Sequence, residues 1–290
     1  MGQARKIVKA PLLATISALA GLLGSGCASN GPTMREVFAG RPEPQFHRVD
    51  FEARSLQYAI TGNPSGPLVL FVHGTPGYWG NFVQFLADSE LADQARVVAM
   101  DRPGWGGSGY LELETSLAVQ ASAVAAVLRE FPDNRPAIVV GHSLGGTIAV
   151  RAAMDFPELI DGAVIVSASL DPEREKTTWY QAASRMGLIR WAVPADLVAA
   201  DEEIKPLPEE LTAMTAGWSD LRPRLIVMQG DRDKLVPFAH VDYPARMAPH
   251  AVIETIKLPD QGHFIPWDNP ATMRDAVLRL LSRLSSAPGK

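Results

Sequence analysis

Ser143 stands in a glycine-rich string that directly follows an apolar run. The string is Gly141-His142-Ser143-Leu144-Gly145-Gly146, and the run is Ala137-Ile138-Val139-Val140. Glycines on both sides of the serine suit a tight strand-to-helix turn, which leaves no room for a Cβ. Such a turn lifts the serine hydroxyl above the sheet edge, and the Leu144 amide at the helix start can donate to a developing oxyanion. Ser143 is therefore a predicted nucleophile.

A serine hydroxyl is a weak nucleophile until a base takes its proton, so a histidine is needed. Among the six histidines, His263 lies in the string Asp260-Gln261-Gly262-His263-Phe264, between the last expected strand and the final expected helix. The chain order serine, aspartate, histidine then makes His263 the predicted base. His142 is expected to point away from the site, as packing or pocket wall. The histidines expected in loops or at the surface are His47, His240 and His250.

The acid that would orient His263 has two close candidates in one string. Gln229-Gly230-Asp231-Arg232-Asp233-Lys234-Leu235-Val236-Pro237 leaves an expected strand and enters a loop. Both Asp231 and Asp233 stand there. The residues themselves leave this choice open.

These side chains need a scaffold, and the hydrophobic pattern predicts one. Alternating segments at 47–52 and 55–60 predict a leading antiparallel hairpin. Short apolar strands are then expected at 68–72, 96–100, 137–140, 163–167, 225–229 and 252–256. Amphipathic helices are expected between or after them, at 81–91, 116–131, 144–156 and 272–284. Buried strands alternating with helices indicate a mostly parallel sheet with helices on both faces.

Four strings in this order resemble the α/β-hydrolase superfamily, and the resemblance covers about 47–286. Besides the serine string, they are His73-Gly74-Thr75-Pro76-Gly77, Asp101-Arg102-Pro103-Gly104-Trp105-Gly106-Gly107-Ser108 and the Gly230-Asp231-Arg232-Asp233 loop. The resemblance implies an α/β-hydrolase fold, an α/β class with a short helical cap insertion. It assigns the acid to Asp233, with Asp231 as its solvated or structural neighbour. Some members of the superfamily carry the acid after the preceding strand instead, where this chain has Asp171.

The same resemblance implies roles for two further loops. The His-Gly turn would supply the second oxyanion donor, the Thr75 amide, beside that of Leu144, with His73 bonding the loop. Asp101 and Ser108 would shape the fold without taking part in chemistry. The family's haloalkane dehalogenases and epoxide hydrolases carry an aspartate where this chain has Ser143, which argues against both activities.

One long segment interrupts the alternation of strands and helices. No strand is expected between Ser169 and Leu221, and apolar residues at 179, 182, 186 and 189 have helical spacing. An insertion there would lie above the carboxyl ends of the strands, where ligands bind in open α/β sheets. We expect a helical cap over the serine at about 170–218. The aromatic residues that hint at an apolar pocket are Trp79, Tyr180, Trp191 and Trp218.

These features predict a serine hydrolase that cleaves a carboxylic ester or lactone through an acyl-enzyme intermediate. The expected partner is a small, apolar acyl substrate, and the chemistry requires no cofactor and no metal. A net charge of −5 in 290 residues does not suggest the basic surface that nucleic-acid binding requires. Hydrolysis of a C–C or peptide bond by the same triad is an alternative. A non-catalytic binding protein on this scaffold is another.

The N-terminal segment has the pattern of an export signal. Three basic residues precede an apolar run at 10–23, too short to span a bilayer, and Gly24-Ser25-Gly26 leads to Cys27, the only cysteine. This resembles a bacterial lipoprotein signal, although glycine replaces the usual leucine three residues before the cysteine. The expected arrangement is a signal peptide at 1–26, a lipidated tether at 27–45 and the hydrolase domain at 46–290. With Ala28 next, the resemblance favours an exported protein anchored through Cys27 to the outer membrane, facing the periplasm.

Overall fold

A computed structural model describes residues 34–175 and 193–286. The proposed signal peptide and Cys27 lie outside the described residues, as do the expected cap residues 179–191. Within the part that is described, no helix combines the length and the apolarity needed to cross a membrane.

The described chain is built around one eight-stranded sheet with the order β1-β2-β4-β3-β5-β6-β7-β8. A hairpin of β1 and β2 forms one edge, and β2 pairs antiparallel with β4. All the remaining neighbours pair in parallel. The strands are β1 (Gln45–Phe51), β2 (Arg54–Gly62), β3 (Leu68–Val72), β4 (Arg96–Met100), β5 (Ala137–His142), β6 (Gly162–Val166), β7 (Arg224–Gly230) and β8 (Ile253–Leu258).

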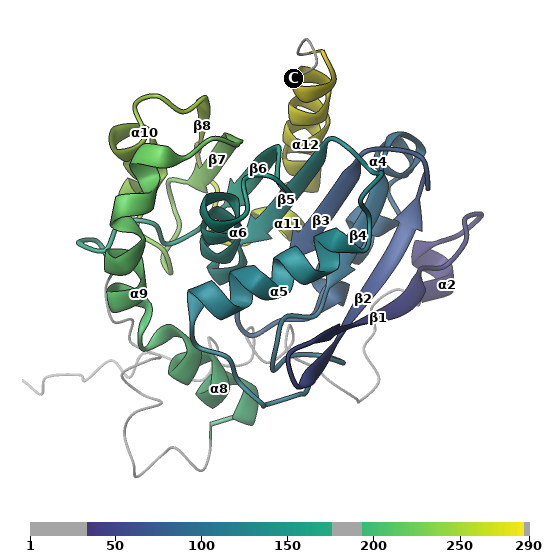
Figure 1. The fold of residues 1–290 in the computed structure, drawn as a ribbon, viewed down its shortest axis with the longest axis horizontal. Helices are drawn as coiled ribbons and strands as arrows, with labels where there is room; N and C mark the ends of the chain where they lie inside the picture. The colour runs from purple at the N-terminus through teal and green to yellow at the C-terminus, as the bar shows by residue number, and fades with distance from the viewer. Residues whose placement is uncertain (1–33, 176–192, 287–290) are drawn as a thin grey trace, which may run out of the picture. The chain divides into compact units, whose positions relative to one another are not determined.

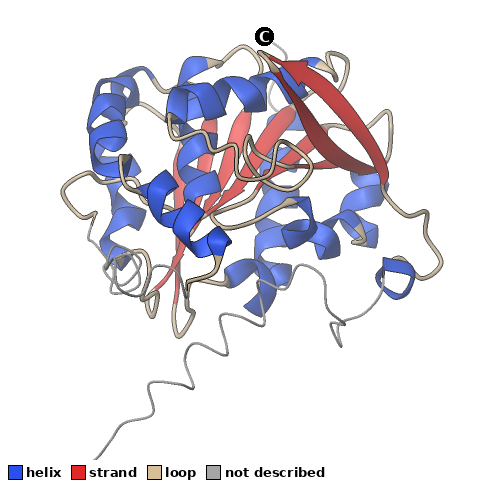
Figure 2. Cartoon of the chain, turned by 90° about the horizontal axis from the view of Figure 1, so that it is seen from below, coloured by secondary structure: helices blue, strands red, loops and turns tan. Residues whose placement is uncertain are grey.

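Helices cover both faces of this sheet (Figures 1 and 2). Helices α5 (Leu117–Arg129) and α6 (Leu144–Asp155) bury their apolar residues in one core cluster. On the other face, α3 (Val83–Leu86), α4 (Ser89–Gln94) and α12 (Pro270–Ser285) share a second cluster. Because successive strand residues point to opposite faces, a strand buried on both faces is apolar throughout, as Leu68–Val72 is. The predicted fold class is confirmed.

All eight predicted strands form, each within two residues of its expected ends. The prediction of one helix at 81–91 is wrong, because the segment divides into η1 (Trp79–Phe82), α3 and α4. Asp88 explains the second break. Its side chain accepts a hydrogen bond from the Leu91 amide at 2.9 Å, which caps a new helix start.

The described part of the expected cap is helical. After β6, it contains α8 (Ala195–Ile204), α9 (Leu207–Met214) and η3 (Thr215–Asp220), with no strand among the described residues up to β7. Trp218 is not the pocket residue that its aromatic side chain hinted at, because it is 1% exposed and belongs to the main core. The remaining short elements are η4 (Phe238–Asp242), α10 (Tyr243–Met247) and α11 (Ile265–Asp268).

Part of the segment expected to be a tether packs on the domain. Residues Met34–Val37 form the short helix α2, and Phe38 is 3% exposed within the second core cluster. An isolated phenylalanine in a Gly- and Pro-rich stretch gives no periodic signal. Its burial depends on the surface offered by distant residues such as Leu86.

Gly145 lets helix α6 begin against the end of β3. A Cβ at this position would lie 2.2 Å from the Val72 carbonyl oxygen and 2.4 Å from that of His73. These are backbone atoms, so they cannot yield as a flexible side chain would. The close approach brings the start of α6 next to the loop that follows β3.

We expect Gly145→Ala to destabilise the protein. Overpacking costs about 1–3 kcal/mol or more, which outweighs the gain of about 1 kcal/mol from replacing a helical glycine with alanine. Chemical denaturation measures the difference. Gly262→Ala is the matched control, because nothing lies within 4 Å of a Cβ there and stability should change little. Equal unfolding free energies for the two variants would contradict the close approach.

Candidate active site

Ser143 occupies a strained turn between β5 and α6. Its backbone angles are φ 55° and ψ −128°, a region that glycine adopts readily and other residues rarely do. The turn is held on one side by the Ser143 amide, which donates to the Val166 carbonyl at 2.9 Å. A Cβ on Gly141 would lie 2.2 Å from the Gly145 carbonyl oxygen, so glycine is required there. Ser143 itself is half-buried.

The loops after β7 and β8 bring Asp233 and His263 together. His263 Nδ1 lies 2.8 Å from Asp233 Oδ2, with both side chains almost fully buried. A carboxylate only accepts here, so in the neutral ring Nδ1 carries the proton and Nε2 has the lone pair. The Asp233 carboxylate also accepts hydrogen bonds from the Leu235 amide, the Val236 amide and the Gln229 side chain. This arrangement fixes the orientation of the ring through Nδ1 and leaves Nε2 as its acceptor nitrogen.

The two other acid candidates have different partners. Asp231 is exposed, and its Oδ1 accepts from the Asp260 amide at 2.8 Å. Asp171 is buried, but its carboxylate is held by the Arg246 guanidinium at 3.1 Å. Of these three aspartates, it is Asp233 that bonds to His263.

His142 packs against His263, a contact that the sequence did not indicate. Its Nε2 donates to the His263 carbonyl oxygen at 2.9 Å, and the two rings lie 4.9 Å apart between centroids. Burial and then the proximity of His263 lower the pKa of His142 to about 3, so the ring is neutral. Trp267 closes the far side with an edge-on contact at 5.4 Å. His142, the residue before Ser143, therefore supports the loop that carries His263.

The loop after β3 lies directly against the serine. A Cβ on Gly74 would stand 2.9 Å from Ser143 Cβ and 3.5 Å from its Oγ, so the close approach requires glycine. The next residue is Thr75, and Leu144 is the first residue of α6. Both oxyanion-hole candidates thus belong to segments that adjoin Ser143.

The Asp101 loop is held by a hydrogen-bond network of its own. Asp101 accepts hydrogen bonds from the amides of Trp79 at 2.7 Å and Gly107 at 2.8 Å, and Ser108 Oγ donates to the Asp101 carbonyl at 2.9 Å. Burial raises the pKa of Asp101. Its oxygens are occupied by loop contacts.

His240 is fully buried within the short helix η4, so its expected place in a loop or at the surface is wrong. Its Nδ1 accepts from the Leu170 and Asp171 amides at 2.9 and 3.0 Å. A sequence pattern could not have shown this, because both partners lie some 70 residues away. Burial lowers the pKa of His240 to about 4.

The two buried histidines predict acid sensitivity. In the unfolded chain both histidines bind a proton near pH 6.5, whereas in the folded protein they stay neutral down to about pH 4. The free energy of unfolding therefore rises with pH between about 4 and 6.5. We expect the unfolding free energy to fall by about 1.4 kcal/mol per pH unit for each histidine as the pH drops through this window. His240→Asn keeps an acceptor for the two amides, and denaturation at pH 7, 6 and 5 should show a shallower slope. An unchanged slope would contradict this assignment.

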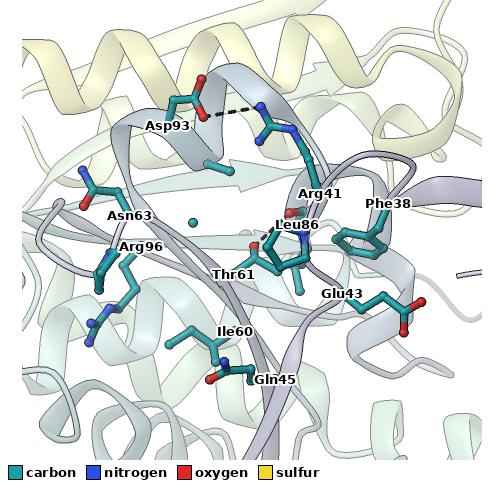
Figure 3. Close-up of a pocket in the computed structure, with 14 residues that line it drawn as sticks. Phe38, Arg41, Glu43, Gln45, Ile60, Thr61, Asn63, Leu86, Asp93 and Arg96 are labelled. Atoms are coloured by element: carbon teal, nitrogen blue, oxygen red, sulfur yellow. Dashed lines mark hydrogen bonds and ion pairs between the residues drawn. The ribbon is translucent and has the colours of Figure 1, made fainter. Parts of the chain in front are cut away.

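A groove of about 690 Å³ opens elsewhere on the domain (Figure 3). Arg41 and Asp93, joined by an ion pair, lie on its rim, and Arg96 at the amino end of β4 lines it. The candidate residues instead follow the carboxyl ends of the parallel strands, so the groove is separate from them. Among the described residues, no group of three or more His, Cys, Asp or Glu side chains is placed to hold a metal ion.

Comparison with known proteins identifies the class. A family model described as "Alpha/beta hydrolase family" matches residues 69–276, and the chain therefore belongs to this family. It is an enzyme of the hydrolase type, in agreement with the fold and with the relatives below.

The similar proteins differ in their chemistry. The chain is 24% identical to 2-(acetamidomethylene)succinate hydrolase of Mesorhizobium japonicum, over 81% of this chain and 94% of that protein. It is 28% identical to a dihydrolipoyllysine-residue acetyltransferase component of the acetoin cleaving system of Cupriavidus necator. That match covers 74% of this chain and 63% of the relative. The crystal structure of a putative aryl esterase from Burkholderia cenocepacia superposes with a TM-score of 0.66 at 22% identity, covering 82% of this chain and 100% of that one.

Proposed function

We propose that this enzyme is a serine hydrolase that cleaves a carboxylic ester or lactone through an acyl-enzyme intermediate. The observation that carries the proposal is the 2.8 Å contact between His263 Nδ1 and Asp233, which leaves Nε2 as an acceptor. Ser143, on its strained turn, belongs to the same edge of the sheet. An oriented base and a serine hydroxyl that the substrate can reach are two requirements for nucleophilic catalysis of acyl transfer.

In the proposed cycle, Ser143 Oγ attacks the substrate carbonyl carbon while its proton passes to His263 Nε2. Asp233 stabilises the imidazolium that forms and keeps the ring in the productive tautomer. Collapse of the tetrahedral intermediate breaks the C–O bond, and His263 gives its proton to the leaving alkoxide. Water then attacks the acyl-enzyme by the same route and releases the carboxylic acid.

The Thr75 and Leu144 amides are the proposed donors to the tetrahedral oxyanion. Support comes from Gly74, whose lack of a side chain lets the loop after β3 approach Ser143. The Leu144 amide also lies at the amino end of α6, where the helix dipole favours negative charge. Loss of one such donor typically costs on the order of 10²–10³ in rate.

We also propose that the enzyme is exported and anchored through Cys27, with a small apolar acyl compound as its substrate. The basic, apolar and small-residue pattern of 1–26 supports export. Multiple acyl chains on one residue would give stable anchoring. Removal of 1–26 takes away three basic and no acidic residues, so the net charge changes from −5 to −8.

A fluorophosphonate probe tests the nucleophile, and a substrate panel tests the bond. The probe should label the purified protein at Ser143 alone, as located by peptide mass spectrometry. Turnover of esters or lactones at a higher kcat/KM than matched amides supports the proposal. If the labelled enzyme cleaves only amides or C–C bonds, the proposed triad stands and the proposed substrate class is wrong. A protein that the probe does not label would contradict the nucleophile itself.

A further inference from the structure

Arg102 is a buried cation in the first turn after β4, and every one of its N–H groups is used. It is 1% exposed. An arginine side chain offers five N–H donors in a rigid plane. Two point at backbone carbonyls of the loop after β3, and the other three point at Gln120 and at Glu203.

The two backbone contacts fall on the loop that adjoins Ser143. Nε donates to the His73 carbonyl at 2.9 Å, and Nη2 donates to the Gly74 carbonyl at 2.9 Å. The Gly74 carbonyl belongs to the same peptide unit as the Thr75 amide. It accepts a second hydrogen bond from His73 Nδ1 at 2.7 Å, while His73 Nε2 accepts from the Arg102 amide. The plane of this peptide unit is therefore fixed from its carbonyl side.

These contacts also act on the strength of the Thr75 amide as a donor. Hydrogen bonds to a carbonyl oxygen polarise the peptide unit and strengthen the N–H at its other end. The guanidinium carries a full positive charge in a buried site of low dielectric, where such polarisation is strongest. An oxyanion on the far side of the peptide would benefit directly.

The other side of Arg102 is held by the cap. Glu203, near the end of α8, accepts from Nη1 at 2.5 Å and from Nη2 at 3.1 Å, and its side chain is fully buried. The Glu203 carboxylate also accepts hydrogen bonds from the Gln120 side-chain amide at 2.9 Å and from the Trp105 indole at 3.1 Å. A buried ion pair of this kind adds little net stability relative to apolar packing, so its value is sought in the geometry it imposes.

We propose that Arg102 is a positioning residue for the oxyanion-binding amide of Thr75, and that Glu203 of the cap helix α8 holds Arg102 in place. The inference rests on the proposed function of Ser143. It makes the cap part of the catalytic apparatus through a chain of contacts from α8 to Arg102 to the Gly74–Thr75 peptide unit.

The test uses variants that keep the size of the side chain while weakening the contacts between α8, Arg102 and the Gly74–Thr75 peptide unit. Arg102→Lys retains the charge but loses the planar fork, and Glu203→Gln retains the shape but loses the charge. Trp105→Phe removes one hydrogen bond to Glu203 and remains available if the first two variants do not fold. Arg135→Lys is the matched control, because Arg135 also binds a carbonyl and a carboxylate, those of Leu159 and Asp161, without touching the loop after β3.

Three quantities are measured for each variant: kcat per active site, KM, and the inhibition constant of an aryl boronic acid. Fluorophosphonate titration counts the competent sites, so misfolded protein does not lower the apparent kcat. The boronic acid forms a tetrahedral anion on the serine, so its affinity responds to the donors of the oxyanion hole. We expect kcat and boronate affinity to fall together, by about 10–10²-fold for Arg102→Lys and less for the other two, since one donor is displaced rather than removed. KM should stay within about twofold, and Arg135→Lys should match the wild type.

The outcomes separate this inference from the proposed function. Absence of wild-type ester turnover and labelling would overturn the proposed function first. If the wild type is active, unchanged kcat and boronate affinity in the folded variants overturn the role of Arg102. A loss of activity that only follows the number of titrated sites would overturn it too, because such a loss marks a purely structural residue.

Discussion

Ser143→Ala is expected to lower kcat for ester hydrolysis by on the order of 10⁵–10⁶-fold, because removing the nucleophile disables the whole triad. The backbone at this position keeps its positive φ, and alanine loses only the hydroxyl, so the fold should persist. Steady-state kinetics on the best substrate of the panel measures the loss.

The control for this variant is structural. Circular dichroism and the melting temperature should match the wild type, and fluorophosphonate labelling should vanish. A folded Ser143→Ala protein that retains full activity would show that another group attacks the substrate. Labelling that persists in the variant would point to a second reactive serine.

The second large effect is expected at the acid. Asp233→Asn should lower kcat by about 10⁴-fold, since an amide can donate to Nδ1 and so stabilise the wrong histidine tautomer. The amide would still accept from the Leu235 and Val236 amides, which bond the other oxygen of this side chain at 2.8 and 2.9 Å. The hydrogen bond from Gln229 Nε2 to the replaced oxygen is lost, but Gln229 keeps its bond to the Val236 carbonyl. The loop geometry should therefore survive, and the loss should appear in kcat at pH 7 with little change in melting temperature.

Asp231→Asn is the matched comparison, two residues away in the same loop. Its oxygen accepts one hydrogen bond from the Asp260 amide, which an asparagine oxygen can also accept. We expect kcat within about twofold of the wild type for this exposed site. A large loss at Asp231 together with a small one at Asp233 would reverse the assignment of the acid.

Much of the scaffold was predictable because its signals are local. Each buried strand is a short apolar run bounded by turn residues, as at Leu68–Val72, and each long helix repeats its apolar residues with the helical period. The glycines on either side of Ser143 were equally informative, since Gly141 and Gly145 are each required by a backbone atom nearby in space. Parallel pairing then places the residues that follow β5, β7 and β8 along one edge of the sheet.

Other features escaped prediction because their causes are distant in the sequence or interrupt a regular pattern. The break between α3 and α4 comes from a cap at Asp88, which interrupts a continuous helical pattern. His240 is buried by partners about 70 residues away, and Phe38 by a surface that only the folded chain provides. A short polar or irregular segment carries no periodicity that would reveal either.

Local sequence was enough to predict the strands, the tight turn at Ser143 and the set of residues from which a triad could be drawn. Glycine content, apolar period and chain order are properties of neighbours, so they can be read along the chain. Three contacts could be established from the folded chain alone: Asp233 and not Asp231 bonds His263, His142 packs against His263, and Glu203 reaches Arg102. Those partners are 30, 121 and 101 residues apart. Their meeting depends on strand order and loop direction, which no local pattern records.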